Sequence, residues 1–265
     1  MSAPVFITGG SSGIGLELAK IFARRGDTVA IFARDASRLQ DAVQVLKSIG
    51  PEARIAAYPV DVGSREATEQ VMRTAIAELG VPGWAIANAG IAEPGLFLEQ
   101  DLDTHDAQMR ANYLGALYFA KTLASPMANA GGGRMVFVSS GAAFFGITGY
   151  SAYAPSKFAM RGLAEVLRVE LAPDRIAVSL VYPPDTDTPM LAYEETMKPA
   201  ESKVITAGGG LWSAADVAAL IVRKAEKGRF AITPGFQMRA LLILSSLIAP
   251  LLRLWQSWVI RRHRG

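Results

Sequence analysis

Short runs of apolar residues alternate with longer segments of helical periodicity along most of the chain. The apolar runs, which we expect to form strands, are residues 5–8, 28–33, 54–59, 84–87, 134–139, 177–182 and 230–233. The helical segments, in which apolar residues recur every three or four positions, are residues 14–25, 36–49, 66–79, 106–127, 152–171 and 213–227. Strands that are apolar throughout are typical of a parallel sheet covered by helices on both faces. The pattern therefore predicts an α/β fold built on a single doubly wound parallel sheet.

The pattern changes near the end of the chain, where residues 240–260 are apolar with few interruptions. A helix over this segment would be about 31 Å long, close to the roughly 30 Å of a bilayer core. Arg253 lies inside the segment, and a central arginine costs about 2.5–3.5 kcal/mol on insertion scales, which offsets the gain from the aliphatic side chains. We therefore expect residues 1–238 to form one domain and residues 239–265 to form an apolar helical tail.

Polar residues in this tail recur every three or four positions, so they would form one narrow stripe on a helix. The stripe comprises Ser246, Ala249 or Pro250, Arg253, and Gln256 or Ser257. Trp255, Trp258 and the arginines of residues 261–264 are residue types that anchor helices at a membrane interface. A helix, or two helices broken at Pro250, lying in one leaflet fits this pattern best. A membrane span and a buried or homo-oligomer-forming element are the alternatives.

The composition narrows the function classes. The chain has 265 residues, 51% of them hydrophobic and 19% charged. It has no cysteine, which excludes disulfides, thiolate zinc sites and cysteine nucleophiles, and its two histidines lie far apart, so we expect no metal site. Five of the 27 basic residues lie in the tail, leaving 22 against 24 acidic residues in 1–238. Because the basic charge is terminal, we expect no nucleic-acid partner.

A glycine-rich segment, TGGSSGIG, joins the first apolar run to the first helical segment. Gly9, Gly13 and Gly15 have a spacing that allows a tight turn and lets a pyrophosphate approach the backbone at a helix N-terminus. The sequence therefore predicts a dinucleotide site in a Rossmann fold. Its loop residues are Gly9, Ser11, Ser12, Gly13, Ile14 and Gly15.

The residue after the second apolar run bears on which dinucleotide is bound. An acidic side chain there would bind the ribose 2′-hydroxyl of NAD, but the first polar residue is Arg34, which can pair with a 2′-phosphate. With Ser11 and Arg38 assisting, this favours NADPH/NADP+ as the cofactor. Asp35 leaves some ambiguity, and a solvated surface arginine is the alternative interpretation of Arg34.

The segment YSAYAPSKFAM places Tyr153 and Lys157 four residues apart, on one face of a helix. An ammonium group close to a tyrosine lowers the pKa of its hydroxyl, which then serves as a proton donor or acceptor. Ser140 follows the fifth apolar run, where ligands bind in doubly wound sheets, and its hydroxyl could hold a carbonyl oxygen.

Taken together, these motifs resemble the short-chain dehydrogenases/reductases over roughly residues 3–235. TGGSSGIG, Asp61–Val62, Asn88–Gly90, Asn112, Ser140 and Tyr153 with Lys157 occur in that family's order and spacing. The resemblance implies a catalytic tetrad of Asn112, Ser140, Tyr153 and Lys157. Tyr153 would protonate the developing alkoxide, Lys157 would lower the tyrosine pKa, Ser140 would orient the carbonyl, and Asn112 would hold a relay water. The resemblance also implies cofactor contacts from Asp61, Val62, Asn88, Ala89, Gly90, Pro183, Thr186 and Thr188, besides Tyr153 and Lys157.

The segment YPPDTDTPM, residues 182–190, bears on the substrate. The wider family has a glycine where this chain has Pro184, which removes a backbone donor at that position. Together with KPAESKVI at 198–205, the segment is similar to the 3-ketodihydrosphingosine reductases, and residues 191–211 would form a lid. Carboxylates there could read the amine of such a substrate, or could only cap the loop and helix. The candidate substrate-binding residues are Asp185, Asp187 and Glu194, with Glu195 beside them.

The resemblance implies NADPH-dependent reduction of the 3-keto group of 3-ketodihydrosphingosine to sphinganine in sphingolipid biosynthesis. The alternatives are a reductase for another lipophilic carbonyl, such as a steroid, a retinal or an acyl ketone, and a non-catalytic NADP-binding protein. We expect the partners to be a long-chain sphingoid ketone and a membrane surface contacted by the tail. The start of the chain has neither a signal-peptide pattern nor an apolar anchor, so we expect a peripheral or monotopic protein on the cytoplasmic face of a bacterial inner membrane.

Overall fold

The computed structural model describes residues 3–206 and 210–264 and contains a seven-stranded sheet in the order β3-β2-β1-β4-β5-β6-β9. All of its strand pairs are parallel. The strands are β1 (Val5–Thr8), β2 (Val29–Ala33), β3 (Ile55–Pro59), β4 (Trp84–Ala87), β5 (Gly133–Val138), β6 (Ile176–Val181) and β9 (Ala231–Ile232). This order, with its reversal between β1 and β4, is that of a Rossmann fold, so the predicted doubly wound sheet is confirmed.

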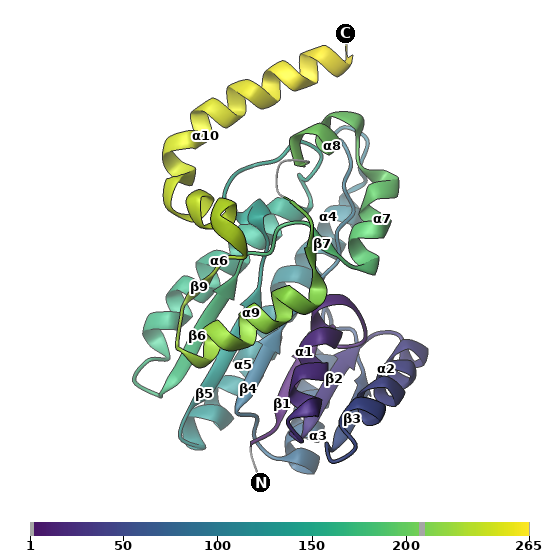
Figure 1. Cartoon of the computed structure of the whole chain (residues 1–265), viewed down its shortest axis with the longest axis vertical. Coiled ribbons are helices and arrows are strands. Elements are labelled where there is room, and N and C mark those ends of the chain that lie inside the picture. Colours follow the sequence, from purple (N-terminus) through teal and green to yellow (C-terminus); the bar gives the residue numbers. More distant parts are fainter. Residues whose placement is uncertain (1–2, 207–209, 265) are drawn as a thin grey trace.

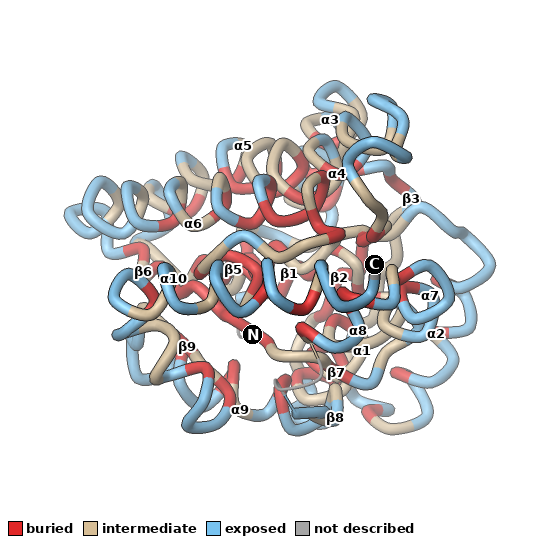
Figure 2. The backbone as a smooth tube through the Cα atoms, turned by 90° about the horizontal axis from the view of Figure 1, so that it is seen from above, coloured by how far each residue is buried: buried red, intermediate tan, exposed pale blue. Residues whose placement is uncertain are grey.

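Helices cover both faces of the sheet (Figure 2). One face carries α1 (Gly13–Arg24), α2 (Ala36–Ile49) and α9 (Ala214–Glu226), and the other carries α3 (Arg65–Leu79), α4 (Leu102–Met109), α5 (Gly115–Asn129) and α6 (Tyr153–Glu170). Each face has its own apolar core, one built around Leu18, Phe22 and Ile31 and the other around Phe6, Phe119 and Phe137. Because both faces are buried, the strands are apolar throughout, as in the sequence pattern.

The helix predicted over residues 106–127 differs in one respect. It begins earlier, at Leu102, and a π-helical turn at Arg110–Leu114 separates α4 from α5. A π-turn inserts an extra residue into the helical repeat and is common at functional sites. The buried Asn112 lies within it, so the turn sets the direction of a predicted catalytic side chain.

Between β6 and α9 the chain forms elements that the sequence pattern did not predict. These are β7 (Thr186–Asp187) and β8 (Trp212–Ser213), which pair with each other, and the helices α7 (Pro189–Met197) and α8 (Ala200–Thr206). Pro189 occupies the first turn of α7, and the Thr188 hydroxyl caps that helix by accepting from the Leu191 N–H. Most of α7 and all of α8 lie in the segment 191–211 predicted as a lid, and β7 and β8 flank it. Residues 207–209 of that segment fall outside the described part of the chain.

The tail forms one continuous helix, α10 (Gly235–Arg264), with Pro250 inside it, and Figure 1 shows that its direction changes sharply between the part near β9 and the part above α8. Figure 1 shows it rising from the carboxyl end of the sheet and extending beyond the rest of the molecule above α8. The boundary predicted between residues 238 and 239 falls inside α10, because Met238 is already part of the apolar core. By length and composition alone, the stretch Gly235–His263 could cross a membrane.

The sides of α10 differ in burial. Ser245, Gln256 and Val259 are buried against the domain, so the predicted polar stripe is only partly right: Ser257 is exposed, whereas the Gln256 amide turns inward and forms hydrogen bonds. The apolar residues of α10 are divided in the same way. One part packs on the domain and the other is exposed, comprising Ile243, Leu244, Leu247, Leu251, Leu254, Trp255 and Trp258.

Candidate active site

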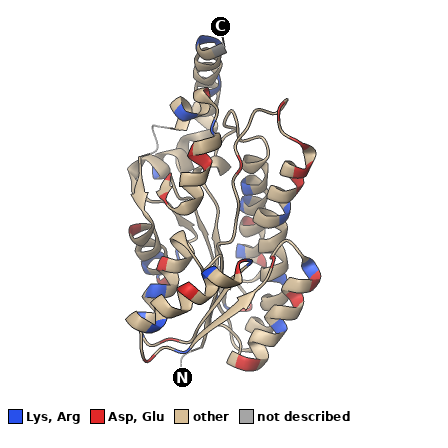
Figure 3. Cartoon of the chain, turned by 90° about the vertical axis from the view of Figure 1, so that its right-hand side faces the viewer, with Lys and Arg blue, Asp and Glu red and all other residues tan. Residues whose placement is uncertain are grey.

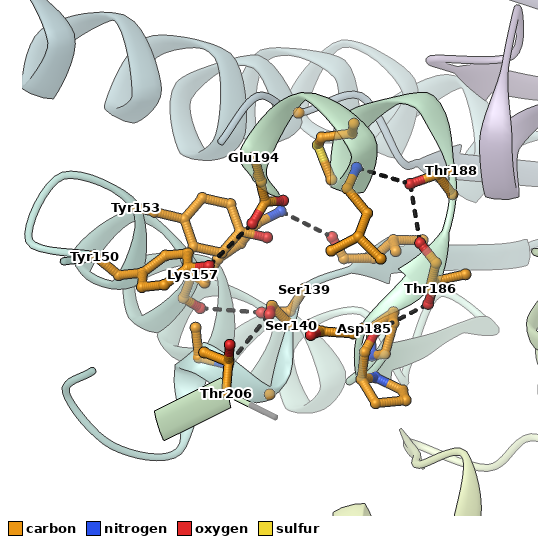
Figure 4. A pocket seen from close by; sticks show the side chains of 18 of the residues that line it. Ser139, Ser140, Tyr150, Tyr153, Lys157, Asp185, Thr186, Thr188, Glu194 and Thr206 are labelled. Carbon is orange, nitrogen blue, oxygen red and sulfur yellow. Dashed lines mark hydrogen bonds between the residues drawn. The ribbon is translucent and has the colours of Figure 1, made fainter. Parts of the chain in front are cut away.

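A cavity of about 600 Å³ lies at the carboxyl ends of the central strands. Its walls come from the glycine loop, the segments after β4, β5 and β6, the start of α6, and parts of α7, α8 and α10. Figure 4 shows the polar groups that converge in it. In doubly wound sheets this edge is where ligands bind, and the volume is that of a site for a cofactor or small molecule.

The glycine loop approaches its neighbours so closely that side chains are excluded. Gly9 and Gly13 have positive φ angles of 67° and 52°, and a Cβ on Gly15 would lie 2.2 Å from the Gly9 carbonyl oxygen. Asn88, after β4, donates from its side-chain amide to the carbonyls of Thr8 and Gly9 and holds the loop against the sheet. The loop therefore presents bare backbone and the N-terminus of α1 to the cavity, a suitable cradle for a pyrophosphate.

Further predicted cofactor residues lie at the ends of β2 and β3. Arg34 is exposed directly after β2, and Arg38 is also exposed but pairs with Asp35 at 3.5 Å. The Asp35 carboxylate also caps α2 by accepting from the Arg38 N–H at 3.0 Å. Asp35 thus has a structural role, which leaves Arg34 as the first polar group available to a ribose substituent.

After β3, the exposed Asp61 accepts from the Gly63 N–H at 2.9 Å, and Val62 is buried against Gly115. Of the predicted loop and cleft residues, Gly9, Ser12, Gly13, Ile14, Asn88, Ala89 and Gly90 line the cavity. The others do not line it: Ser11, Arg34, Asp61 and Val62 lie in the adjoining loops, Gly15 in the first turn of α1 and Arg38 in the first turn of α2.

Tyr153 and Lys157 enter the cavity from the first turns of α6, and Ser140 enters from the segment after β5. The Lys157 ammonium lies 5.4 Å from the centre of the Tyr153 ring and donates to the Val138 carbonyl at 3.3 Å. The Ser140 hydroxyl accepts from the Ala142 N–H, which fixes the serine at the start of a short 3-10 turn. The structure thus brings together the three residues expected to act on a carbonyl group.

Burial dominates the protonation of this pair. It raises the pKa of Tyr153 well above its ordinary value, assisted by the negative charge of Glu194 and opposed by a hydrogen bond with Ser140. It lowers the pKa of Lys157 to about 8, because an ammonium loses its hydration inside the protein. The expected lowering of the Tyr153 pKa by Lys157 is not among these effects, and burial sets the direction of the shift.

Asn112 completes the predicted tetrad from the side of the π-turn. Its side-chain oxygen accepts from the Ile91 N–H at 2.8 Å, and its amide donates to the Ile91 carbonyl and to the Ser156 hydroxyl. A Cβ on Gly90 would lie 2.9 Å from the Asn112 oxygen and 3.5 Å from the Lys157 ammonium, so only Gly90 separates these two groups. Asn112 is thus locked close to Lys157.

The segment after β6 passes over the glycine loop. Pro183, Thr186 and Thr188 all line the cavity, and the Thr188 side chain lies so close to Gly13 that a Cβ there would meet it at 3.0 Å. The Thr186 hydroxyl donates to the Pro184 carbonyl, and the Thr188 hydroxyl donates to the Thr186 carbonyl. Pro184 therefore sits in a hydrogen-bonded turn that keeps Thr188 beside the predicted phosphate site.

The three predicted substrate carboxylates have different environments. Glu194 is buried in the cavity wall beside Tyr153 and accepts from the Tyr150 hydroxyl at 3.1 Å (Figure 4). Burial raises the pKa of Glu194 to about 7, against the opposing effects of Lys198 and of the hydrogen bond from Tyr150. Asp185 also lines the cavity but pairs with Lys198 at 3.7 Å. Asp187 is exposed on β7 and does not line the cavity.

Comparison with known proteins identifies the family. The sequence profile of the short chain dehydrogenases matches residues 3–199. This chain belongs to that family. The chain is 38% identical to a 3-dehydrosphinganine reductase of Danio rerio over 88% of its length and 71% of the relative's. It is 36% identical to a 3-ketodihydrosphingosine reductase of Dictyostelium discoideum, over 93% of this chain and 78% of the relative.

Solved structures of short chain dehydrogenases have the same architecture. A short-chain dehydrogenase from Sphingobium yanoikuyae in complex with NADPH superposes with a TM-score of 0.80 at 25% identity, over 95% of this chain and 96% of that one. Levodione reductase superposes with a TM-score of 0.82 at 20% identity, over 90% and 98% of the two chains. The enzyme class predicted from the motifs, an oxidoreductase of the short chain dehydrogenase family, is confirmed.

The structure of this short chain dehydrogenase adds residues that sequence reasoning missed. Thr8 accepts from the N–H groups of Asn88 and Ala89, and Ser156 accepts from Asn112 and donates to the Tyr153 carbonyl at 2.6 Å. Tyr150, the partner of Glu194, was also missed. All three lie inside motifs that the sequence displays, but their roles depend on contacts with distant segments. Within the described residues there is no cluster of side chains suited to a metal ion.

Proposed function

We propose that this enzyme reduces the 3-keto group of 3-ketodihydrosphingosine to sphinganine with NADPH. The observation that carries the proposal is the buried carboxylate of Glu194 in the same cavity as Tyr153, Ser140 and Lys157. A 3-ketosphingoid base has an ammonium group next to its ketone, and the cavity offers groups for both. The relatives named 3-dehydrosphinganine and 3-ketodihydrosphingosine reductase support this substrate.

The residues at the cofactor end fit a phosphorylated dinucleotide. A Cβ at Gly15 would collide with the Gly9 carbonyl, so the tight loop needs a glycine there, and Gly9 and Gly13 present bare backbone to the cavity where a phosphate would bind. Arg34 would hold the 2′-phosphate, because the neighbouring Asp35 caps α2. When bound, NADPH supplies the hydride, and the similarity to a short-chain dehydrogenase in complex with NADPH supports this choice.

The chain's own residues supply a proton and an orientation. Tyr153 retains its proton at neutral pH because burial raises the pKa of its hydroxyl, so it serves as the acid that protonates the carbonyl oxygen as that oxygen becomes an alkoxide. Ser140 holds the same oxygen by a hydrogen bond. Lys157 would return a proton to Tyr153 and would itself be reprotonated from solvent through a water held at Asn112, from which only Gly90 separates it.

Glu194 would recognise the ammonium group of the substrate. An ammonium beside this carboxylate would replace the hydration that burial removes, and it would keep Glu194 ionised at neutral pH. Asp185 is the weaker candidate because Lys198 already pairs with it, and Asp187 faces solvent. These contacts support Glu194 over Asp185 and Asp187 as the group that binds the amine.

Three variants and two substrates test this assignment. Glu194→Gln should lower kcat/KM for the amino ketone at least about 10-fold, the loss of one charged hydrogen bond, while leaving kcat/KM for the ketone lacking the amine within about 2-fold. Asp187→Asn serves as the matched control and should change neither value, and Asp185→Asn should have an intermediate effect. Equal losses on both ketones with Glu194→Gln would show that Glu194 is structural and would contradict the assignment.

We also propose that α10 binds this enzyme to the surface of an anionic membrane. Its exposed apolar residues, Ile243 to Trp258, lie within a sector of roughly 120° at about 100° per residue. Arg253, Arg261 and Arg262 are exposed on the same helix, which has no acidic residue (Figure 3). An apolar sector with adjoining arginines suits a lipid surface with anionic head groups. The buried contacts of Gln256 and Val259 favour a helix lying in one leaflet over one that leaves the domain to span the bilayer.

Flotation with lipid vesicles tests this second proposal. The full chain should float with vesicles containing an anionic lipid, and the variant Leu247→Asp with Leu251→Asp should remain in the dense fraction. Ser246→Asp, a charge on the exposed polar side of the same helix, is the control and should still float. If the full chain is recovered as a soluble homo-oligomer that does not float with vesicles, membrane binding is contradicted and the oligomer interpretation is supported. We propose that the enzyme binds the cytoplasmic face of the membrane. That this membrane is a bacterial inner membrane is a prediction from the sequence.

A further inference from the structure

The C-terminal helix forms part of the wall of the catalytic cavity. Leu241, Leu252 and Trp255 on α10 line the same cavity as Tyr153 and Ser140, together with the apolar side chains Phe145, Ile147 and Met190. Trp255 is also 40% exposed and adjoins the exposed apolar sector of α10. Trp255 therefore connects the apolar wall of the cavity with the surface that we assign to the membrane.

One side chain holds this helix in place. Gln256 is only 6% exposed, and its amide bonds to the loop between β5 and α6 through both of its ends. Its oxygen accepts from the Thr148 N–H at 3.0 Å and from the Thr148 hydroxyl at 3.3 Å, and its nitrogen donates to the Gly146 carbonyl at 3.0 Å. Such a buried amide with all of these bonds made is costly to misplace. Val259, one turn further along, is 1% exposed and adds an apolar contact.

The loop that forms hydrogen bonds with Gln256 also contacts α8 in the predicted lid and leads into α6, the helix of Tyr153 and Lys157. The Thr148 carbonyl accepts from the Ser202 hydroxyl of α8 at 2.8 Å, and the Gly149 carbonyl accepts from the Gly95 N–H at 2.8 Å. The next residues along the chain are Tyr150, the partner of Glu194, and then Tyr153. The position of α10 is therefore coupled to the lid and to the residues that read the polar end of the substrate.

We propose that Leu241, Leu252 and Trp255 form the subsite for the alkyl chain of the substrate and that Gln256 is a positioning residue for this subsite. The inference rests on the proposed function. It places the alkyl chain of a long-chain amino ketone against the α10 wall, and the polar end of that substrate at Glu194 and Tyr153. The alkyl chain of the substrate leaves the cavity past Trp255 toward the apolar sector of α10. A substrate dissolved in the bilayer then reaches Tyr153 without its chain crossing water.

Chain-length dependence tests the subsite. With 2-amino-3-keto substrates of increasing length, each kept below its critical micelle concentration and free of detergent, kcat/KM should rise about 4-fold for each methylene buried. Trp255→Ala should flatten this rise, with a loss of 10-fold or more on the long-chain ketone and less than 2-fold on the shortest. Gln256→Leu should reproduce this pattern. Phe236→Ala removes an aromatic side chain that is 85% exposed on α10 and does not line the cavity, and it should leave the rise unchanged.

Two readouts keep the failure of this inference separate from failure of the proposed function. If the wild-type chain reduces none of the amino ketones, the proposed function is wrong. If it reduces them but Trp255→Ala and Phe236→Ala give the same chain-length dependence, the subsite is wrong. A long-chain amine with a diazirine in mid-chain gives a result without turnover. Labelling of peptides from residues 241–255 supports the subsite, whereas labelling that avoids α10 overturns it, and circular dichroism verifies that each variant is folded.

Discussion

Burial of Tyr153 decides the direction in which its hydroxyl can act. A tyrosine whose pKa is raised keeps its proton at neutral pH, so it can donate to a reduced carbonyl oxygen. Sequence reasoning identified Tyr153 and Lys157 through their spacing, but it predicted a lowered tyrosine pKa. The magnitude of desolvation depends on how the cavity closes around the residue, and spacing along a helix contains no information about that.

At the scale of this residue we expect Tyr153→Phe to abolish most turnover while leaving NADPH binding intact. General acid–base catalysis contributes about 10²–10⁴-fold, so kcat should fall by at least about 100-fold. Quenching of tryptophan fluorescence by NADPH and the rate of NADPH oxidation measure the two properties separately. Retained turnover would remove Tyr153 from the proton-donating role, and loss of cofactor binding would show that the substitution damages the site as a whole.

Glu194 makes the stability of the protein depend on pH. The pKa of its carboxyl rises from 4.5 to about 7 on folding, so between these values the folded protein holds a proton that the unfolded chain has released. The contribution to the free energy of unfolding is therefore complete below about pH 4.5 and is lost as the pH rises through 7. It amounts to about 3 kcal/mol at most.

Denaturant unfolding of wild type and Glu194→Gln between pH 5 and pH 8 measures this contribution. The difference in stability should grow in favour of the glutamine variant as the pH rises, since glutamine has no charge to bury. Lys157 titrates in a higher window, because its lowered pKa is about 8, so it does not produce the same signal. A difference that stays constant over the range would show that Glu194 is ionised in the folded protein throughout.

At the scale of elements, regular segments were predictable and irregular ones were not. The strands and helices of the Rossmann fold follow from apolar periodicity, which the sequence displays directly. The π-turn at Arg110–Leu114, the short β7 and β8, and the inward turn of Gln256 depend on contacts with segments far away in the sequence. The glycine loop lies between these cases. Its glycines are visible in the sequence, but only the structure shows that Gly15 must be a glycine because the Gly9 carbonyl lies against it.

The loop gives a matched pair of glycine substitutions. Gly15→Ala places a Cβ 2.2 Å from the Gly9 carbonyl oxygen, so the loop must shift and NADPH affinity should fall at least about 10-fold. Gly162→Ala on α6 has nothing within 4 Å of the added Cβ and should raise the free energy of unfolding by roughly 0.5–1 kcal/mol through helix propensity. Calorimetric titration and thermal unfolding measure both effects. Unchanged NADPH affinity in Gly15→Ala would contradict the cradle.

At the scale of the whole molecule, one cavity contains Tyr153 and Glu194 at its polar end and Leu252 and Trp255 of α10 in its apolar wall, and Trp255 adjoins the exposed sector of α10. Each of these parts was visible in the sequence, as the catalytic tetrad, the carboxylates after the sixth apolar run and the apolar tail of residues 239–265. Their arrangement could not be predicted, because it depends on the docking of α10 through Gln256 onto a loop more than a hundred residues earlier. This arrangement is the reason why a long-chain amino ketone fits the molecule better than a compact soluble ketone.

The most direct measurement is the rate of NADPH oxidation by the purified full chain with 3-ketodihydrosphingosine, compared with a steroid ketone, a retinal and a simple acyl ketone. The account predicts turnover with 3-ketodihydrosphingosine, a kcat/KM for it at least about 10-fold above that for any other carbonyl compound, and much slower oxidation of NADH. Comparable or faster reduction of the ketones that lack an amine, or an equal rate with NADH, would contradict it.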